Sequence, residues 1–222
     1  MCGRYTMHHT TDQLAMRFGV QQVASAATER YNIAPTQPVP VVIETPETRV
    51  LDAYRWGLIP SWADDPAIGN KLINARAETL AEKPSFKSAL VKRRCLIPSD
   101  GFYEWQKLAD NSKQPMYIQL SDKDLFAFAG LWEEWKQPDG TPLRTCTIIT
   151  VGPNEVMAPI HNRMPAILRP GDEALWLDPS QKSVPDLLSL LKTYPADRIE
   201  AIPVSKRVNT PTIDDPTLLS PL

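Results

Sequence analysis

At residues 95–105 the chain reads Cys95-Leu96-Ile97-Pro98-Ser99-Asp100-Gly101-Phe102-Tyr103-Glu104-Trp105, and this stretch predicts two short strands joined by a turn. The first three residues form an apolar run typical of a buried strand, and the aromatic residues at the end favour a second strand. Between them, the sequence Pro-Ser-Asp-Gly contains the proline and glycine that mark a turn. Short strands separated by turn residues continue through the rest of the chain.

Further short apolar or β-branched runs lie on both sides of this stretch. Strands are predicted at 39–44, 49–54, 116–120, 125–131, 145–151 and 198–203, the first of them an edge strand because it contains Pro40. A short helix is predicted to start within 10–13 and to stop at Gly19, and others are predicted at 85–90, 172–177 and 185–194, with a helix entry at 153–155 and a loop at 30–36. Because strands and helices do not alternate regularly, we expect an α+β fold. It would be a single domain of residues 1–222, with a mostly antiparallel, barrel-like sheet and short peripheral helices.

The composition is ordinary for a folded globular protein. Of 222 residues, 42% are hydrophobic and 23% charged, and the net charge is -2. This excludes the bulk basicity of a non-specific nucleic-acid binder but allows a local basic groove. The three cysteines form no Cys-x-x-Cys pair and cannot all be disulfide-bonded, which favours reduced thiols. No apolar run approaches the ~20 residues that span a bilayer, so we expect a cytoplasmic protein without a membrane partner.

The N-terminal sequence Met1-Cys2-Gly3-Arg4-Tyr5 offers unusual chemistry. Removal of Met1 would leave Cys2 with a thiol and a free α-amine, whose pKa lies near ~7.7–8.0. Such a 1,2-aminothiol condenses with an aldehyde, because the amine forms an imine and the thiol then closes a five-membered thiazolidine ring. Arg4 adds a guanidinium that suits phosphate. The alternative is that Cys2 is an untethered terminal residue.

Polar groups elsewhere stand among apolar neighbours. Alternation along a strand places Asn74, Arg76 and Glu78 on one face, directed either to a site or to solvent. Aromatic residues bracket Glu104 and would raise its pKa, which suits acid–base chemistry unless the carboxylate points outward. His161 lies in a proline-bounded loop and titrates in the range of a proton shuttle, or else only hydrogen-bonds its neighbours.

No metal is predicted. His8 and His9 lie close to Cys2, but no spacing of histidine and cysteine matches a zinc site, so we expect neither a metal nor another cofactor. Aromatic side chains interleaved with arginines could instead stack on bases beside phosphate ligands, as in proteins that hold single-stranded nucleic acid. The residues concerned are Tyr5, Trp56, Trp62, Phe102 and Trp105 with Arg4, Arg55 and Arg76. We expect only one or two of these rings to reach a ligand, because most buried tryptophans are core.

Motifs are spread over most of the chain. They are Met-Cys-Gly-Arg-Tyr at 1–5, Tyr-Asn-Ile-Ala-Pro at 31–35, Trp-Gly-Leu-Ile-Pro at 56–60, Ile-Asn-Ala-Arg-Ala-Glu-Thr at 73–79, Gly-Phe-Tyr-Glu-Trp at 101–105, Ile-His-Asn-Arg-Met-Pro at 160–165 and Pro-Val-Ser at 203–205 with Val208-Asn209. In this order, with a cysteine at the second position, they resemble the SOS-response-associated peptidase (SRAP) family. Members of that family are sensors that crosslink to abasic sites in single-stranded DNA.

The resemblance implies roles for particular residues. Cys2 would form a thiazolidine with the ring-opened sugar aldehyde of an abasic site, and Asn74 would position the substrate and the N-terminal amine. Glu104 would be the acid–base group of imine formation, and His161 would assist ring opening and reversal. The implied DNA contacts are Arg4, Arg76 and Arg163 to phosphates, Trp62 stacked beside the strand and Thr150 with a hydroxyl near the lesion.

Two other functions fit the same residues. In the first, Cys2 is the nucleophile of a cysteine or N-terminal-nucleophile peptidase with His161 as base, and Met1 could be removed by such a reaction. In the second, arginines and aromatics form a non-covalent single-strand binder, whose binding would survive Cys2→Ala and fall steeply with salt. The function we expect is the lyase-like crosslinking, carried out by a cytoplasmic monomer that joins the nucleoid when it meets damaged DNA.

Overall fold

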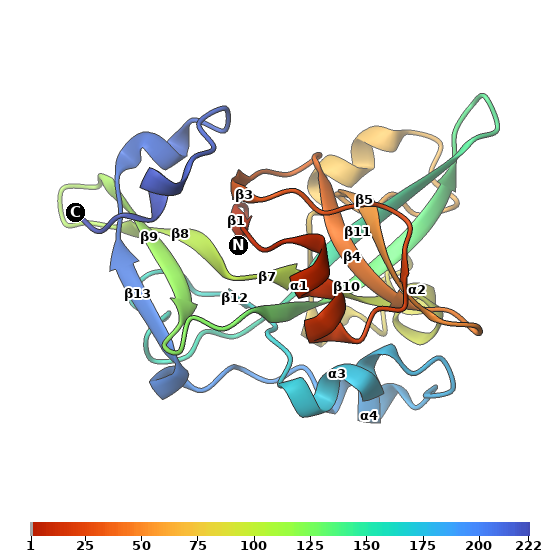
Figure 1. Cartoon of the computed structure of the whole chain (residues 1–222). Helices are drawn as coiled ribbons and strands as arrows, with labels where there is room; N and C mark the ends of the chain where they lie inside the picture. Colours follow the sequence, from red (N-terminus) through yellow and green to blue (C-terminus); the bar gives the residue numbers. More distant parts are fainter. Residues whose placement is uncertain (1) are drawn as a thin grey trace.

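The computed structural model describes residues 2–222 and is built mainly from β-strands (Figure 1). The strands are β1 (Tyr5–Met7), β2 (Gln22–Val23), β3 (Arg30–Ile33), β4 (Pro38–Glu44), β5 (Arg49–Trp56), β6 (Asn74–Arg76), β7 (Arg94–Ser99), β8 (Gly101–Lys107), β9 (Lys113–Leu120), β10 (Phe126–Lys136), β11 (Pro142–Val151), β12 (Met164–Pro165) and β13 (Ile199–Pro203). The α-helices are α1 (Thr11–Phe18), α2 (Lys87–Lys92), α3 (Pro170–Leu177) and α4 (Val184–Ser189). Short 3₁₀ turns lie at Pro66–Lys71, Ala77–Thr79, Ala196–Arg198, Lys206–Asn209 and Pro216–Leu219.

The strands form two sheets. The smaller sheet has the order β13-β9-β8-β1-β3, and the larger has the order β12-β11-β10-β7-β4-β5-β2, with β6 paired to β11. Because β11 also pairs with β5, the strands β11-β10-β7-β4-β5 close into a ring. Most pairs are antiparallel, and the parallel ones among the described residues are β11–β5, β11–β6 and β2–β5. The predicted α+β, single-domain, barrel-like fold with short helices is confirmed.

The turn predicted before Gly101 is wrong. β7 and β8 are separated by Asp100 alone, where the chain passes from the larger sheet into the smaller one. The Asp100 carboxylate accepts hydrogen bonds from the Thr6 hydroxyl and the His8 backbone N–H. A residue of β1 and the residue that follows β1 therefore fix the chain where it bends at Asp100. Glycine is needed at the next position, because a Cβ on Gly101 would lie 2.2 Å from the Tyr117 hydroxyl oxygen. The two strands are thus nearly one segment that links both sheets.

The capping signals in the sequence predicted the ends of one helix correctly and the start of another wrongly. α1 begins and ends as predicted: the Thr10 hydroxyl accepts a hydrogen bond from the Gln13 backbone N–H, the Thr10 backbone N–H donates to Gln13 Oε1, and Gly19 adopts the left-handed conformation with φ 64°. The prediction that Ser85 caps the second helix is wrong, since α2 begins at Lys87 without a side-chain cap. The helix entry predicted at 153–155 is also wrong, because the chain there forms irregular turns.

Two predictions that were based on prolines, a loop at 30–36 and an edge strand at 39–44, are wrong because both segments pair with other strands. The segment 30–36, predicted as a loop, contains β3, whose residues pair with β1. The segment 39–44 is not an edge, since β4 lies between β5 and β7 in the sheet order. β4 pairs with β7 at Val42 opposite Leu96, two residues beyond Pro40. The missing N–H of that proline is tolerated because the β7 ladder does not reach it.

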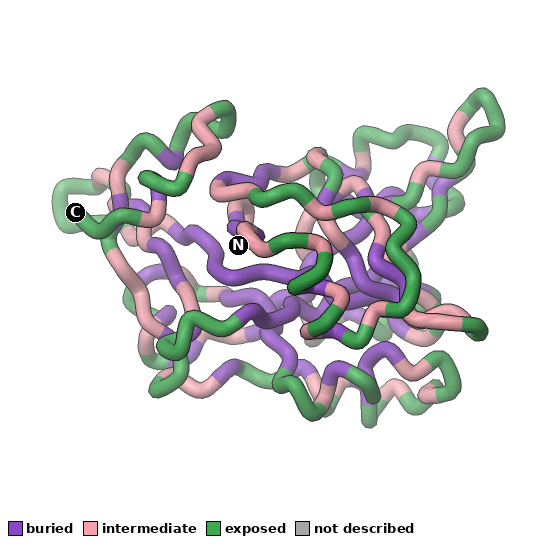
Figure 2. Tube along the Cα trace, in the orientation of Figure 1, coloured by how far each residue is buried: buried purple, intermediate pink, exposed green. Residues whose placement is uncertain are grey.

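The N-terminal residues are part of the main core, which runs through the ring of strands (Figure 2). Cys2, Tyr5 and Met7 are all fully buried. The Tyr5 ring packs edge-on against Trp56 and Phe128, with centroid separations of 5.4 and 5.7 Å, an arrangement that aromatic quadrupoles favour. The untethered-terminus alternative for Cys2 is therefore wrong. All three cysteines are free and buried, and no helix within residues 2–222 is long and apolar enough to cross a membrane.

Arg94 is buried beneath α2 and α3 and replaces missing helix caps. Its guanidinium donates hydrogen bonds to backbone carbonyls at the ends of both helices and in the segment after α3. The acceptors are the carbonyls of Leu90, Val91, Trp176, Asp178 and Gln181. Carbonyls at a helix C-terminus have no partner within the helix, so one side chain satisfies groups from two elements.

We expect Arg94→Met to lower the free energy of unfolding by about 2–3 kcal/mol, because the apolar side chain fills the space but leaves several buried carbonyls without donors. Chemical denaturation monitored by tryptophan fluorescence measures this change. The matched control is Lys92→Met on the exposed side of the same helix, expected to stay within ~0.5 kcal/mol of the parent. Equal effects for the two variants would contradict the capping role of Arg94.

Candidate active site

Cys2 lies in extended backbone immediately before β1 and is fully buried. Its carbonyl accepts a hydrogen bond from Asn74 Nδ2 at 2.8 Å, and its Sγ lies 3.8 Å from the Arg4 carbonyl oxygen. Burial, followed by the nearby Glu104 carboxylate, raises the pKa of the Cys2 thiol well above its ordinary value. The sulfur is therefore a neutral thiol at physiological pH, and the residue is held by Asn74 through its carbonyl and lies near the Glu104 carboxylate.

Of the two polar atoms of the Asn74 side-chain amide, the nitrogen makes a hydrogen bond and the oxygen makes none within residues 2–222. This residue begins β6, which runs parallel to β11 and places Asn74 opposite Ile148. Its Nδ2 holds the Cys2 carbonyl, whereas its Oδ1 is buried and has no hydrogen-bond partner within residues 2–222. A buried acceptor without a donor costs about 1–3 kcal/mol. The oxygen is thus positioned to accept a hydrogen bond from a group that arrives beside Cys2.

Glu104 lies on β8, the strand that pairs with β1. The amide of Tyr103 donates to the Arg4 carbonyl at 2.9 Å, so β8 runs beside the residues that follow Cys2. The Glu104 side chain is buried, and this burial raises the pKa of its carboxyl group. The predicted direction of the shift is confirmed, and the alternative of an outward-pointing carboxylate is wrong.

His161 lies in the irregular segment between β11 and β12. Its Nδ1 accepts a hydrogen bond from the Arg163 amide at 3.1 Å and also lies 3.2 Å from the Arg163 carbonyl oxygen, so the following residues of the loop orient the ring. The imidazole is near enough to Glu104 to lower the pKa of that carboxyl, opposing the larger effect of burial. All four residues predicted to be catalytic are therefore brought into one neighbourhood.

Arg163, predicted to bind phosphate, is held by protein groups. Its Nη1 and Nη2 donate to the two carboxylate oxygens of Glu78 at 2.7 and 2.9 Å, and Nη2 also donates to the Thr150 carbonyl at 2.6 Å. The Arg163 side chain is 14% exposed and that of Glu78 is 56% exposed. The arrangement lowers the pKa of Glu78 through its hydrogen bond to Arg163. The guanidinium is consequently fixed at the rim of the site.

Thr150, predicted to offer a hydroxyl to the lesion, is fully buried on β11 between β6 and β12. Its Oγ1 donates to the Ala75 carbonyl at 3.4 Å and lies 3.4 Å from Arg163 Nη2. Through these contacts the Thr150 side chain helps to hold β6 and Arg163 in place.

Arg4 joins the N-terminus to distant parts of the chain. Its Nη1 donates to Asn32 Oδ1 at 2.7 Å and to the Val208 carbonyl at 2.8 Å. The guanidinium carbon lies 5.9 Å from the centroid of Trp105. Sequence reasoning missed Asn32, although a motif contains it, because the carbonyls that its amide binds belong to the C-terminal segment. Arg4 thus clamps the start of the chain as well as carrying charge beside the site.

Two of the predicted DNA contacts are open to solvent. Trp62 is 58% exposed, high for so large an apolar ring. Its loop is held by the Trp135 indole, which donates to the Ala63 carbonyl at 2.7 Å. The Arg76 side chain is exposed on β6, two residues after Asn74, and makes no hydrogen bond with the rest of the described chain. Both groups are accessible to a macromolecular ligand.

These features define a class of protein: a barrel-like sheet with a buried cysteine at the second position, an amide bound to its carbonyl, a buried carboxyl close to it and an imidazole close to that carboxyl, together with exposed basic and aromatic groups. A model of the family described as SOS response associated peptidase (SRAP) matches residues 1–211. The chain belongs to the SRAP family, as the motifs in its sequence indicate.

Curated relatives and solved structures agree with this assignment. The chain is 48% identical to the abasic site processing protein YoqW of Bacillus subtilis (strain 168), over 99% of both chains. It is 38% identical to the abasic site processing protein HMCES of Gallus gallus, covering 86% of this chain and 66% of that protein. A crystal structure of a protein from Bacteroides thetaiotaomicron matches with a TM-score of 0.90 and 30% identity, over 100% of both chains.

Proposed function

We propose that this protein captures abasic sites in single-stranded DNA by forming a thiazolidine crosslink through Cys2 after removal of Met1. One observation carries the proposal: Asn74 Nδ2 donates a hydrogen bond to the carbonyl of Cys2, while the buried Oδ1 of Asn74 has no donor among residues 2–222. The α-amine exposed by removal of Met1 would be on that same residue, so it could supply the donor. The names of the relatives, abasic site processing proteins, support the choice of an aldehyde-bearing lesion as substrate.

In the proposed reaction, the Cys2 α-amine attacks the C1′ aldehyde of the ring-opened sugar and forms a C–N bond. The resulting carbinolamine loses its hydroxyl as water, with a proton from Glu104, and becomes an imine. The Cys2 S–H then adds across the C=N bond, so that sulfur bonds to C1′ and the proton ends on nitrogen. Glu104 regains the proton that the amine gives up, and the net change is the release of one water molecule.

The protonation states support amine attack before sulfur addition. Because burial raises the pKa of Glu104, a larger fraction of that carboxyl is protonated near neutral pH and can donate to the departing hydroxyl. Because burial also raises the pKa of the Cys2 thiol, the sulfur is a poor initial nucleophile. The same property weighs against a general cysteine peptidase, which needs a thiolate. Removal of Met1 by the protein itself remains a separate reaction that peptide assays would test.

DNA binding in this proposal depends on the exposed groups around the buried centre. Arg76 would pair with phosphate and Trp62 would stack on a base. Arg163 and Arg4 would add positive potential at the rim, since Nη1 and Nη2 of Arg163 and Nη1 of Arg4 already donate to protein groups. His161 would assist opening of the sugar ring and reversal of the crosslink. The protein would act as a cytoplasmic monomer, reach the nucleoid through damaged DNA and need no cofactor.

We expect Arg76→Gln to weaken binding of single-stranded DNA and to lower the slope of log K against log salt concentration by about 0.7, the value for one lost phosphate contact. Fluorescence anisotropy with a labelled oligonucleotide at several salt concentrations measures both quantities. The control is Lys136→Gln, because Lys136 pairs with Pro142 at the far end of β11, whereas Arg76 lies opposite Thr150. A slope unchanged by Arg76→Gln would contradict a phosphate contact at this position.

The direct test of the function is a denaturing gel. Protein lacking Met1 is incubated with single-stranded DNA that contains one abasic site, and with intact DNA of the same sequence. The proposal predicts a heat-stable shifted band that requires the abasic site. If native gels show binding but no covalent band forms, the non-covalent alternative is favoured. Cleavage of peptides without a covalent band would favour the peptidase.

A further inference from the structure

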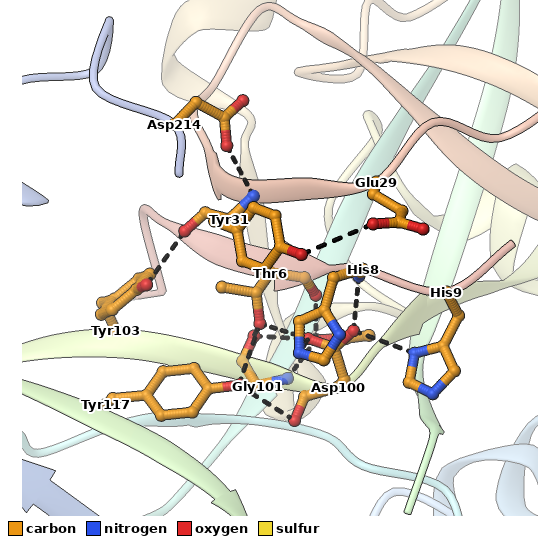
Figure 3. A network of polar contacts seen from close by, with 11 residues as sticks. Thr6, His8, His9, Glu29, Tyr31, Asp100, Gly101, Tyr103, Tyr117 and Asp214 are labelled. Atoms are coloured by element: carbon orange, nitrogen blue, oxygen red, sulfur yellow. Dashed lines mark hydrogen bonds and ion pairs between the residues drawn. The ribbon is translucent and has the colours of Figure 1, made fainter. Parts of the chain in front are cut away.

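A second group of reactive side chains lies away from Cys2, where β1 meets the junction of β7 and β8. His8 Nε2 lies 3.4 Å from Asp100 Oδ1, and His9 Nδ1 lies 3.1 Å from Asp100 Oδ2. Figure 3 shows both imidazole rings beside this carboxylate. The three ligand-type atoms lie within 4.8 Å of one another. Sequence reasoning missed the group because Asp100 is distant in sequence and was assigned to a turn.

From this geometry we propose that His8, His9 and Asp100 form a binding site for a divalent transition-metal ion, with Zn²⁺ as the ion that fits the ligands best. Zinc binds imidazole nitrogen and carboxylate oxygen at about 2.0–2.2 Å, and neighbouring ligand atoms around a tetrahedral ion are then roughly 3.3–3.5 Å apart. His9 Nδ1 lies at nearly that separation from Oδ2, and His8 Nε2 lies at that separation from Oδ1, so a rotation of the carboxylate or of one ring brings both nitrogens around one oxygen and the ion. Two imidazoles and one carboxylate leave the fourth position to water.

The carboxylate is oriented as a metal ligand requires. Asp100 is only 3% exposed, and it accepts hydrogen bonds from the Thr6 hydroxyl and from the His8 amide at 2.6 Å. Ligating carboxylates are commonly fixed by such outer contacts.

The imidazoles are accessible and partly pre-arranged. The side chains of His8 and His9 are 30% and 22% exposed, so an ion can reach their nitrogens and the rings can rotate toward it. The His8 ring is stacked between Tyr31 and His9, at centroid separations of 5.3 Å in both cases. A bound ion would replace the proton shared by His9 and Asp100 and would tie the end of β1 to the junction that leads into β8.

The test uses the full chain without a histidine tag, in a Cys2→Ala background so that the terminal aminothiol does not chelate. Co²⁺ is titrated and followed by its visible absorption, and Zn²⁺ is then used to displace it. We expect one ion per chain. His8→Gln and His9→Gln should each weaken binding by more than the roughly 10–100-fold caused by loss of an outer-shell partner. His161→Gln, which changes the remaining histidine of the three, should bind as tightly as the parent.

Thermal unfolding provides a second readout that does not depend on colour. Zn²⁺ should raise the Tm of the parent and of His161→Gln, but not of His8→Gln or His9→Gln, since an ion that binds only the folded state stabilises it. Melting in the presence of EDTA establishes that each variant is folded. Undetectable binding to the parent, or equal affinity in the parent and in both His8→Gln and His9→Gln, would overturn the proposal.

Discussion

Replacing Cys2 by alanine is expected to abolish the heat-stable complex with abasic single-stranded DNA, a loss of more than about 10³-fold in crosslinked product. Alanine keeps the α-amine after removal of Met1, so an imine can still form, but it cannot close the sulfur-containing ring. The imine hydrolyses when the complex is denatured. Binding of intact DNA should persist, because phosphate contacts are made by other side chains. Densitometry of denaturing gels measures the covalent fraction.

A matched cysteine substitution separates chemistry from packing. Cys95→Ala changes another fully buried thiol, one on β7, and should leave crosslinking intact. Reaction of the Cys2→Ala variant in the presence of borohydride should restore a covalent band, because the reductant traps the imine. A heat-stable band formed by Cys2→Ala without reductant would show that sulfur is not part of the crosslink.

Replacing Glu104 by glutamine is expected to slow crosslinking by about 10²–10⁴-fold, the range typical of a lost general acid–base group. Glutamine keeps the size and polarity of the side chain but cannot donate the proton that the departing hydroxyl needs. Single-turnover rates across pH values measure the effect. The parent rate should fall at high pH as Glu104 loses its proton, and this limb of the profile should disappear in the variant. A parallel profile with an unchanged rate would assign the acid role elsewhere.

The same substitution should raise stability at neutral pH. Burial raises the pKa of Glu104 in the folded state above its unfolded value of about 4.3. The folded protein therefore binds this proton more tightly, and the contribution of Glu104 to the free energy of unfolding decreases as pH rises between the unfolded and folded pKa values. Since Glu104→Gln has no such loss, its Tm should exceed that of the parent at pH 7 and approach it in acid. A lower Tm at pH 7 would contradict this account.

Much of the fold could be predicted from the sequence because many of its signals are local. Thr10 and Gly19 define α1 through caps that use only neighbouring residues. Most of the longer strand runs were likewise found, although β10 and β11 are longer than predicted and the short strands β1, β2, β3 and β12 were not predicted. The errors arise where partners are distant: Asp100 is held by residues around β1, and Pro40 is tolerated because the neighbouring ladder begins beyond it. Neither relation can be inferred from spacing.

The site was predictable to a similar degree. Residue types and the family resemblance selected Cys2, Asn74, Glu104 and His161, which the structure brings into one neighbourhood. The aromatic neighbours of Glu104 correctly indicated a raised pKa. The sequence did not predict the ion pair between Arg163 and Glu78 or the hydrogen bond from Arg4 to Asn32. Both depend on partners more than 25 residues away in the sequence, whose positions only the folded chain defines.

In the proposed crosslink, both reactive atoms of Cys2 bond to the sugar. Intact mass spectrometry of the complex between Met1-processed protein and abasic single-stranded DNA tests it most directly. We expect a product whose mass is the sum of the two partners minus one water. Borohydride should not change this mass, because a thiazolidine has no C=N bond to reduce. Peptide mapping should place the adduct on Cys2. A product that gains two hydrogens with borohydride, or an adduct on a lysine, would contradict the thiazolidine.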